Sequence, residues 1–294
     1  MAEPTRRPQT RHRIGIDMKI NLQGNIVSSQ SVRVNPINSL WLNNGILTES
    51  LRVYKQKILF LEDHYFKLMS KLRISRTPIP IELTPDYFYR QLQQTLEANE
   101  LENAILHFHA GLLQNKLEFI ITVQNDVAPI QSDYHLGNYT DFYIEENPLE
   151  FLGFGQGYAR MFQVFADENQ WDDLLIFRKV KSVLRTKNGC LFILHKGTLR
   201  SSIPQEPWRS VWQSNFLEFL SSVTETPIEP DSTIFPYEVS QAEGVFVWQD
   251  FIGMQPVTQY KNKAVPMHSD FSVWQNEWNN YLDLVAEKDP LQHI

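Results

Sequence analysis

A polar stretch at residues 125–138, NDVAPIQSDYHLGN, divides this chain into two segments and constrains the fold more than any other feature of the sequence. It contains proline, glycine, asparagine and aspartate, which favour turns and loops. On each side of it, runs with strand-like alternation mix with runs that repeat apolar residues at helical spacing. We therefore predict two mixed α/β domains, a smaller one at 18–124 and a larger one at 139–285, joined by a linker at 125–138.

In the first segment, short β-like runs precede two helical patterns. Apolar residues at helical spacing predict a helix at 62–73. Thr84 followed by Pro85 predicts the start of a second helix, since threonine caps helices and proline suits their first position. The predicted strands are KINL, ESLRVY and KILF before these helices, and AILHFH and LEFIITV after them.

The second segment repeats this mixture with more strands. We predict strands at 141–144, 173–177, 190–194 and 244–248, the last running on to Met254–Val257. Helices are predicted at 157–169, with Tyr158, Met161, Phe162 and Phe165 inward, and at 209–223 and 269–283. Each half thus has enough apolar sequence for its own core, and no internal repeat relates them.

Composition excludes several classes of protein. The only cysteine, Cys190, rules out an intramolecular disulfide and every multi-cysteine metal site, and it fits a reducing cytoplasm. No apolar run reaches the roughly 18–20 residues of a membrane span, and the net charge of −7 without a basic face argues against nucleic acid. The arginine-rich residues 1–17 are predicted to be a disordered basic tail, and 286–294 a second tail.

Four segments, read in order, resemble the class IV aminotransferase family, the fold-type IV PLP enzymes that include branched-chain and D-amino-acid aminotransferases and aminodeoxychorismate lyases. They are ESLRVYKQKILFLEDHYFKLMSKLRIS, FADENQWDDLLIF, NGCLFILHKGTL and EVSQAEGVFVWQDFIGMQPVTQYKNK. The resemblance implies a two-domain α/β fold with mixed sheets (D-amino-acid aminotransferase-like), in which a small domain and a larger pseudo-barrel domain enclose the cofactor. It also implies a homodimer.

The same resemblance places unsuitable residues at the two catalytic positions. The lysine that forms the Schiff base with PLP corresponds to Leu152, and no lysine occurs between Lys116 and Lys179. The glutamate that keeps the pyridine nitrogen protonated corresponds to Arg185. An arginine opposes that protonation, and without an amine the covalent chemistry has no handle. We therefore expect no catalytic residue and no cofactor; PLP returns only if the alignment at 152 is wrong.

The implied phosphate and substrate positions have also changed. Lys67 replaces the phosphate-binding arginine of the family, and Glu206-Pro207-Trp208-Arg209 replaces a turn whose amides approach the phosphate. Asn43 replaces a tyrosine near the cofactor, and Asp250 lies where a hydroxyl is usual. Lysine holds a phosphate only as a point charge, and proline removes an amide donor. The cations Lys67, Arg185 and Arg209 are candidate contacts for a small anion.

Three further patterns each have a functional and a purely structural interpretation. The glycines of GFGQGYAR, Gly155 and Gly157 among them, form either an anion-binding turn before a helix or only a tight turn. His107 and His109 lie on one face of a strand, where they line a substrate pocket or are simply hydrogen-bonded. Glu62, Asp63 and His64 are read as helix-start residues rather than an acid–base group. No metal site is expected.

These observations favour a protein of this fold without PLP catalysis, a pseudoenzyme that binds a small anionic metabolite or a protein partner. The alternative is an active PLP-dependent aminotransferase or aminodeoxychorismate lyase acting on an amino acid or amino-chorismate substrate. An enzyme that works without PLP is the third hypothesis, for which the sequence offers no nucleophile or base. In each case we expect a cytoplasmic homodimer.

Overall fold

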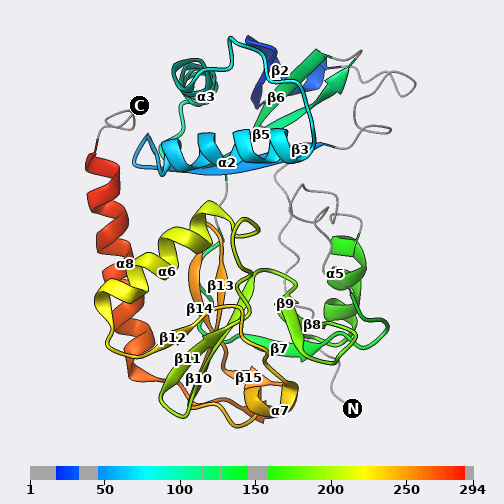
Figure 1. Ribbon diagram of the computed structural model, residues 1–294, viewed down its shortest axis with the longest axis vertical. Helices are drawn as coiled ribbons and strands as arrows, with labels where there is room; N and C mark the ends of the chain where they lie inside the picture. The colour runs from blue at the N-terminus through cyan, green and yellow to red at the C-terminus, as the bar shows by residue number, and fades with distance from the viewer. Residues whose placement is uncertain (1–17, 33–45, 114–115, 126–127, 145–157, 289–294) are drawn as a thin grey trace, which may run out of the picture.

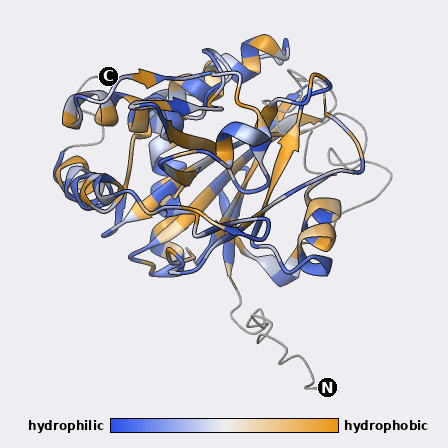
Figure 2. Cartoon of the chain, turned by 90° about the horizontal axis from the view of Figure 1, so that it is seen from below, coloured by the Kyte–Doolittle hydropathy of each residue, from blue (hydrophilic) through white to orange (hydrophobic). Residues whose placement is uncertain are grey.

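The computed structural model contains three sheets with helices packed around them (Figure 1). It describes residues 18–32, 46–113, 116–125, 128–144 and 158–288. None of the helices in these ranges is both long and apolar enough to cross a membrane. In Figure 2 the apolar colour follows the strands in the middle of the molecule, and the connecting loops are mostly polar.

The first sheet is antiparallel and has six strands in the order β2-β1-β6-β5-β3-β4. Helices α2 (Leu61–Ile74) and α3 (Pro85–Asn99) cover one of its faces, where Leu68, Leu72 and Phe88 meet apolar strand residues. The strands are β1 (Lys19–Leu22), β2 (Asn25–Ser28), β3 (Leu47–Tyr54), β4 (Lys57–Ile58), β5 (Ala104–Leu113) and β6 (Lys116–Gln124), and a 3-10 turn η1 (Ser29–Ser31) follows β2.

The other two sheets have five strands each, in the orders β12-β11-β10-β13-β14 and β16-β15-β7-β8-β9. Apolar residues of both sheets share one buried cluster, so the sheets pack on each other. Their strands are β7 (His135–Asn138), β8 (Asp173–Phe177), β9 (Val183–Thr186), β10 (Cys190–His195), β11 (Thr198–Ser201), β12 (Ile228–Glu229), β13 (Gly244–Gln249), β14 (Gly253–Pro256), β15 (Gln259–Tyr260) and β16 (Lys263–Ala264).

In the described part of the chain, four helices accompany these sheets. α5 (Ala159–Glu168) packs on β8 and β9 through Phe162 and Ala166. α6 (Val211–Val223) and α8 (Ser269–Glu287) pack together against β10 and β13, in a cluster rich in aromatic rings. α7 (Pro236–Val239) is a single turn. These helices therefore cover the two sheets. α6 lies beside α2, the helix of the first sheet.

The start of α2 joins the six-stranded sheet to this aromatic cluster. Leu59 belongs to the cluster, and the ring centroid of Phe60 lies 5.1 Å from that of Trp212 and 6.5 Å from that of Trp278. Phe60 holds a left-handed backbone conformation, with φ of 53°, which turns the chain into α2. Next to it, the guanidinium of Arg52 donates to the carbonyl of Phe251 at 2.6 Å. The region around α2 is thus fixed to the C-terminal sheets.

Most predicted elements are present, and the differences have physical reasons. The last four residues of the predicted linker form β7, because parallel pairing with β8 and β15 gives their backbone groups partners. Gly137 suits that strand, since an added Cβ would lie 1.9 Å from the ring of Trp171. Residues 141–144 form no strand. Tyr158 and Met161 are exposed, because α5 packs through residues further along. The proposed domain boundaries remain a prediction.

Candidate functional site

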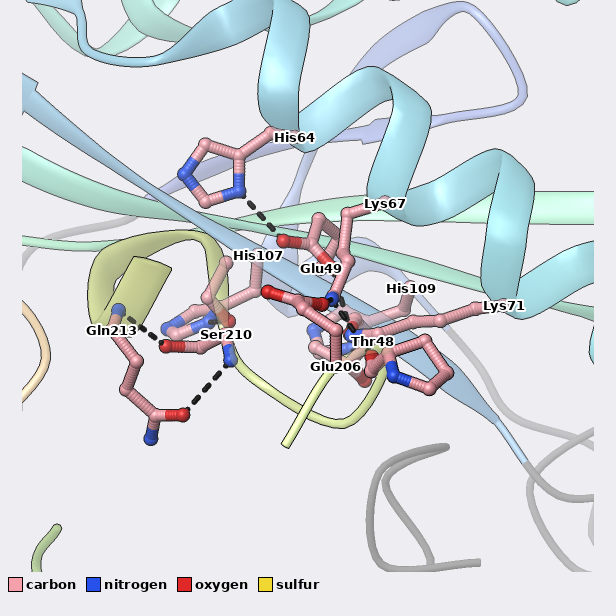
Figure 3. Close-up of polar contacts among 12 residues, drawn as sticks. Thr48, Glu49, His64, Lys67, Lys71, His107, His109, Glu206, Ser210 and Gln213 are labelled. Atoms are coloured by element: carbon pink, nitrogen blue, oxygen red, sulfur yellow. Dashed lines mark hydrogen bonds and ion pairs between the residues drawn. The ribbon is translucent and has the colours of Figure 1, made fainter. Parts of the chain in front are cut away.

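A buried cluster of three charged or polar side chains lies between β3 and α2. Glu49 points from the middle of β3 toward the helix and accepts a hydrogen bond from Nδ1 of His64 at 2.6 Å (Figure 3). The Nζ of Lys71 lies 2.7 Å from the other carboxylate oxygen and also donates to the carbonyl of Thr48 at 2.6 Å. Burial raises the pKa of Glu49, but Lys71 and His64 together outweigh it and hold that pKa below its usual value. The carboxylate is therefore charged.

One turn earlier on α2, Lys67 reaches the loop that precedes α6. Its Nζ donates to the carbonyl of Pro207 at 2.8 Å and lies 3.4 Å from a carboxylate oxygen of Glu206 (Figure 3). The other oxygen of Glu206 accepts from the hydroxyl of Ser214 at 2.7 Å. Burial lowers the pKa of Lys67, and Glu206 only partly offsets this. A partly buried ammonium and a carboxylate thus face each other between α2 and the loop before α6.

The loop from 204 to 210 is held by its own hydrogen bonds. The guanidinium Nε of Arg209 donates to the carbonyl of Pro204 at 2.7 Å. Ser210 caps α6 in a capping box, in which its hydroxyl accepts from the amide of Gln213 at 3.1 Å and the Gln213 side chain accepts from its amide at 3.0 Å. The chain itself therefore uses two of the amides that a helix start would otherwise offer to an anion.

Asp250 lies just beyond β13, close to this capping box. Its carboxylate accepts from the indole of Trp248 at 3.2 Å. Burial raises the pKa of Asp250 to about 6, although hydrogen bonds from Ser210 and Trp248 act in the opposite direction. Burial and then the nearby Asp250 raise the pKa of the Cys190 thiol, which argues against a nucleophilic cysteine.

Arg185 projects from β9 toward α5. Its guanidinium carbon lies 5.9 Å from the ring centroid of Phe162, and one terminal nitrogen donates to the carbonyl of Thr186 at 3.3 Å. It lies near enough to Cys190 to lower the pKa of that thiol, against the effects of burial and Asp250. The structure therefore places the half-buried positive charge of Arg185 between α5 and the Cys190 region.

The two histidines of β5 lie on the face of the sheet that points away from α2 and α3. Nδ1 of His107 lies 2.8 Å from the hydroxyl of Ser50, and His109 lies 3.0 Å from the hydroxyls of Thr48 and Thr122. Burial lowers the pKa of both, and that of His109 falls to about 4. At neutral pH these are uncharged, hydrogen-bonded imidazoles, and no group of three metal ligands occurs among the described residues.

The structure brings together only some of the predicted site residues. Lys67 meets the loop that carries Arg209, and Asp250 and Arg185 both lie close to Cys190. Asn43, Leu152, Gly155 and Gly157 lie outside the described residues. Glu62, Asp63 and His64 lie at the start of α2 as predicted, but Glu49 and Lys71 were not predicted, nor was the contact of His64 with Glu49. A signal was present, since an acid at an inward position of β3 needs a partner, and His64 and Lys71 lie seven residues apart on one face of α2.

Comparison with known proteins identifies the fold. No family model and no curated protein sequence matches this chain. Solved structures match nearly its whole length. An Escherichia coli branched-chain amino acid aminotransferase matches with a TM-score of 0.79 at 12% identity, covering 95% of this chain and 98% of its own. The branched-chain aminotransferase of Thermobaculum terrenum in its PLP form has a TM-score of 0.75 at 15% identity, covering 93% and 95%.

A third structure is a putative 4-amino-4-deoxychorismate lyase from Legionella pneumophila, with a TM-score of 0.74 at 17% identity, covering 85% of this chain and 96% of its own. At these identities the likeness shows the fold alone. The mixed α/β, fold-type IV architecture predicted from the sequence is therefore confirmed.

The comparisons overturn the prediction that no cofactor belongs to this chain. The solved structures with this fold include the PLP form of the Thermobaculum terrenum enzyme, so the fold points to PLP. The prediction failed because it rested on single positions. A replaced lysine removes a covalent bond, whereas the fold can keep the surrounding cavity and the cations that hold a phosphate.

Two observations bear on how the described residues would hold PLP, while Leu152, the position that the resemblance aligns with the lysine, lies outside them. Arg185 brings a guanidinium to the position for which the resemblance implies a carboxylate. The amines of Lys67 and Lys71 are both engaged by carboxylates and carbonyls. By the resemblance, this guanidinium would lie where a carboxylate holds the protonated pyridine nitrogen, and its charge would oppose that protonation.

Proposed function

We propose, from the fold that this chain shares with the class IV aminotransferases, that it binds a small anionic ligand and does not itself carry out aminotransferase or lyase chemistry. The single observation that carries the proposal is the half-buried guanidinium of Arg185 on β9, which lies near enough to Cys190 to lower the pKa of its thiol. Its positive charge would attract an anionic ligand and oppose a protonated pyridine.

Lys67 and Arg209 support the same proposal, because they bring two positive charges to the loop before α6. Lys67 holds its ammonium against the loop before α6, and Arg209 lies on that loop. Pyridoxal phosphate and pyridoxamine phosphate are the first ligands to test, because they combine a phosphate with the ring that solved structures of this fold hold. We expect reversible binding without a bond to a lysine. That the protein is a cytoplasmic homodimer stays a prediction.

One observation favours the second candidate, an active PLP enzyme. Burial lowers the pKa of Lys67, and a lowered pKa makes an amine a better nucleophile at neutral pH. This candidate ranks second because Lys67 extends from α2 to the loop before α6, where its amine already contacts a carbonyl and a carboxylate. The two candidates differ in whether any lysine forms a covalent adduct.

A titration of the purified protein with pyridoxal phosphate separates the two candidates. Visible absorbance follows binding, and borohydride reduction with peptide mass spectrometry locates any adduct. We expect saturable binding without a specific lysine adduct, weakened by Arg185→Ala and unchanged in the matched control Arg90→Ala, whose side chain is exposed on α3. A stoichiometric adduct on one lysine would overturn the proposal and identify the catalytic residue.

A further inference from the structure

Glu206 holds the position on Lys67 that an incoming anion would need. One carboxylate oxygen lies 3.4 Å from the ammonium, and the other accepts from Ser214 on α6 at 2.7 Å. The neighbouring carbonyl of Pro207 accepts from the same ammonium at 2.8 Å. Glu206 therefore joins α2 to the loop before α6 (Figure 3), and its hydrogen bond with Ser214 extends the connection to α6.

The two partners of this ion pair differ in their exposure to solvent. The side chain of Lys67 is 12% exposed, whereas that of Glu206 is 54% exposed. Glu206 can turn into solvent at small cost, because an exposed carboxylate remains hydrated and its ion pairs are weak. The mostly buried ammonium stays in place, where it keeps the carbonyl of Pro207 as an acceptor at 2.8 Å and the charge of Glu49 nearby. Departure of Glu206 therefore leaves a place for another anion.

The tether decides which anions can take that place. A group attached to the same chain competes at a high effective concentration, on the order of millimolar for a short flexible connection. A free carboxylate has the same charge as Glu206 and lacks this advantage. A phosphate monoester carries a charge of about −1.5 to −2 and three strong acceptor oxygens, so it interacts with the ammonium more strongly than a carboxylate does.

We propose that Glu206 is an intramolecular competitor at the Lys67 anion site, which a doubly charged phosphate group displaces at a lower concentration than a carboxylate does. The inference rests on the proposed function, because it assumes that an anionic ligand binds at this junction. It adds that, without a ligand, Glu206 neutralises the charge of Lys67. Binding of a ligand then includes the release of Glu206 from Lys67 and Ser214.

Binding of inorganic phosphate and of acetate to Glu206→Gln and to the unmodified protein tests this proposal. Calorimetry at low ionic strength gives both affinities. We expect Glu206→Gln to bind phosphate about three- to tenfold more tightly and to bind acetate more tightly by a similar factor, because one competitor is removed for both anions. The matched control is Glu229→Gln, which removes an exposed carboxylate that faces Arg200 at 3.6 Å, far from Lys67 in the sequence. This control should bind phosphate as the unmodified protein does.

Two further variants keep the result interpretable. Ser214→Ala loosens Glu206 without changing any charge, so it should also tighten phosphate binding, by a smaller factor. Lys67→Met should abolish the gain of Glu206→Gln when the two are combined. Equal phosphate affinities for the unmodified protein and Glu206→Gln would refute competition by Glu206 but would not contradict the proposed function. Absence of phosphate and pyridoxal phosphate binding in every variant would overturn both.

Discussion

Lys67 and Lys71 lie one turn apart on α2, and each has a carboxylate partner, yet their surroundings differ. The partner of Lys71 is Glu49, a strand residue whose side chain is 5% exposed. The partner of Lys67 is Glu206, a loop residue whose side chain is 54% exposed. The ammonium groups themselves are buried to nearly the same degree. The difference therefore lies in the anion, and it separates a fixed contact from an exchangeable one.

The comparison gives a general criterion for reading ion pairs. When both partners are buried, removal of either leaves a charge that water cannot reach, so the pair is part of the folded core. When only the cation is buried, the anion can be replaced by another of suitable charge. Burial of the anion, more than the distance between the charges, indicates which lysine can take a ligand.

The largest expected effect comes from removing the buried anion. Glu49→Ala leaves Lys71 and His64 without their common partner, so it should lower the free energy of unfolding by about 3–5 kcal/mol. Urea denaturation measures the loss. Glu206→Ala is the matched control, with an expected change below about 1 kcal/mol. Similar losses in the two variants would remove the distinction between the two lysines.

The buried carboxyl of Asp250 should oppose folding once it is charged. Its pKa rises from 3.8 to about 6 on folding, so the native state binds more protons between these values and stability falls as the pH rises through them. Asp250→Asn removes this penalty and should stabilise the protein by about 1–3 kcal/mol above pH 6 and little below pH 4.

Thermal or urea unfolding across this pH range measures the difference. Asp283→Asn serves as the control, because its exposed carboxylate pairs with Lys55 at 2.7 Å. A stabilisation by Asp250→Asn that is independent of pH would contradict the assignment of a raised pKa to this carboxyl.

His109 should make stability depend on pH in the direction opposite to Asp250, because it is buried as a neutral base. Folding lowers its pKa from 6.5 to about 4, so stability falls as the pH decreases through this range, because the unfolded state takes up the proton first. In His109→Gln, the free energy of unfolding should decrease by about 1–2 kcal/mol less between pH 6.5 and pH 4. The expected difference is reduced because the ring keeps some exposed surface. NMR titration of the imidazole checks it directly, and an observed pKa near 6.5 would refute it.

The smallest effect belongs to the exchangeable pair. Lys67→Met and Glu206→Gln should each change the free energy of unfolding by no more than about 1 kcal/mol, because the pair has one exposed partner. Both variants should nevertheless change phosphate binding, in opposite directions. A loss of several kcal/mol in Glu206→Gln would show that this contact is as structural as the one made by Lys71.

The sequence predicted the elements of the fold better than the site. Alternating strands and helical stripes are local, so α2, α3, α6, α8 and the central strands were predicted close to their observed bounds. β7 was not, because its pairing partners lie distant in the sequence and its glycine is explained only by the ring of Trp171. Local patterns do not contain such contacts.

The site depended even more on contacts between distant residues. Alignment of motifs predicted that Lys67, Arg185, Arg209 and Asp250 matter, and the structure gives each a defined environment. It did not predict that Glu206 would lie against Lys67, which is 139 positions away. Nor did it predict that Glu49 would turn His64 and Lys71 into one buried network, since burial of a charge is visible only when the surrounding elements are assembled.

The packing of Phe60 against Trp212 and Trp278 has a consequence for biosynthesis. A ribosome adds roughly 5–20 residues per second, and Trp278 follows Phe60 by more than two hundred positions. Trp278 is therefore synthesised on the order of ten to forty seconds after Phe60, and the contact between them forms no earlier. During that interval the side chain of Phe60 lacks both aromatic contacts, so the packing of α2 against the C-terminal aromatic cluster is completed only late in synthesis.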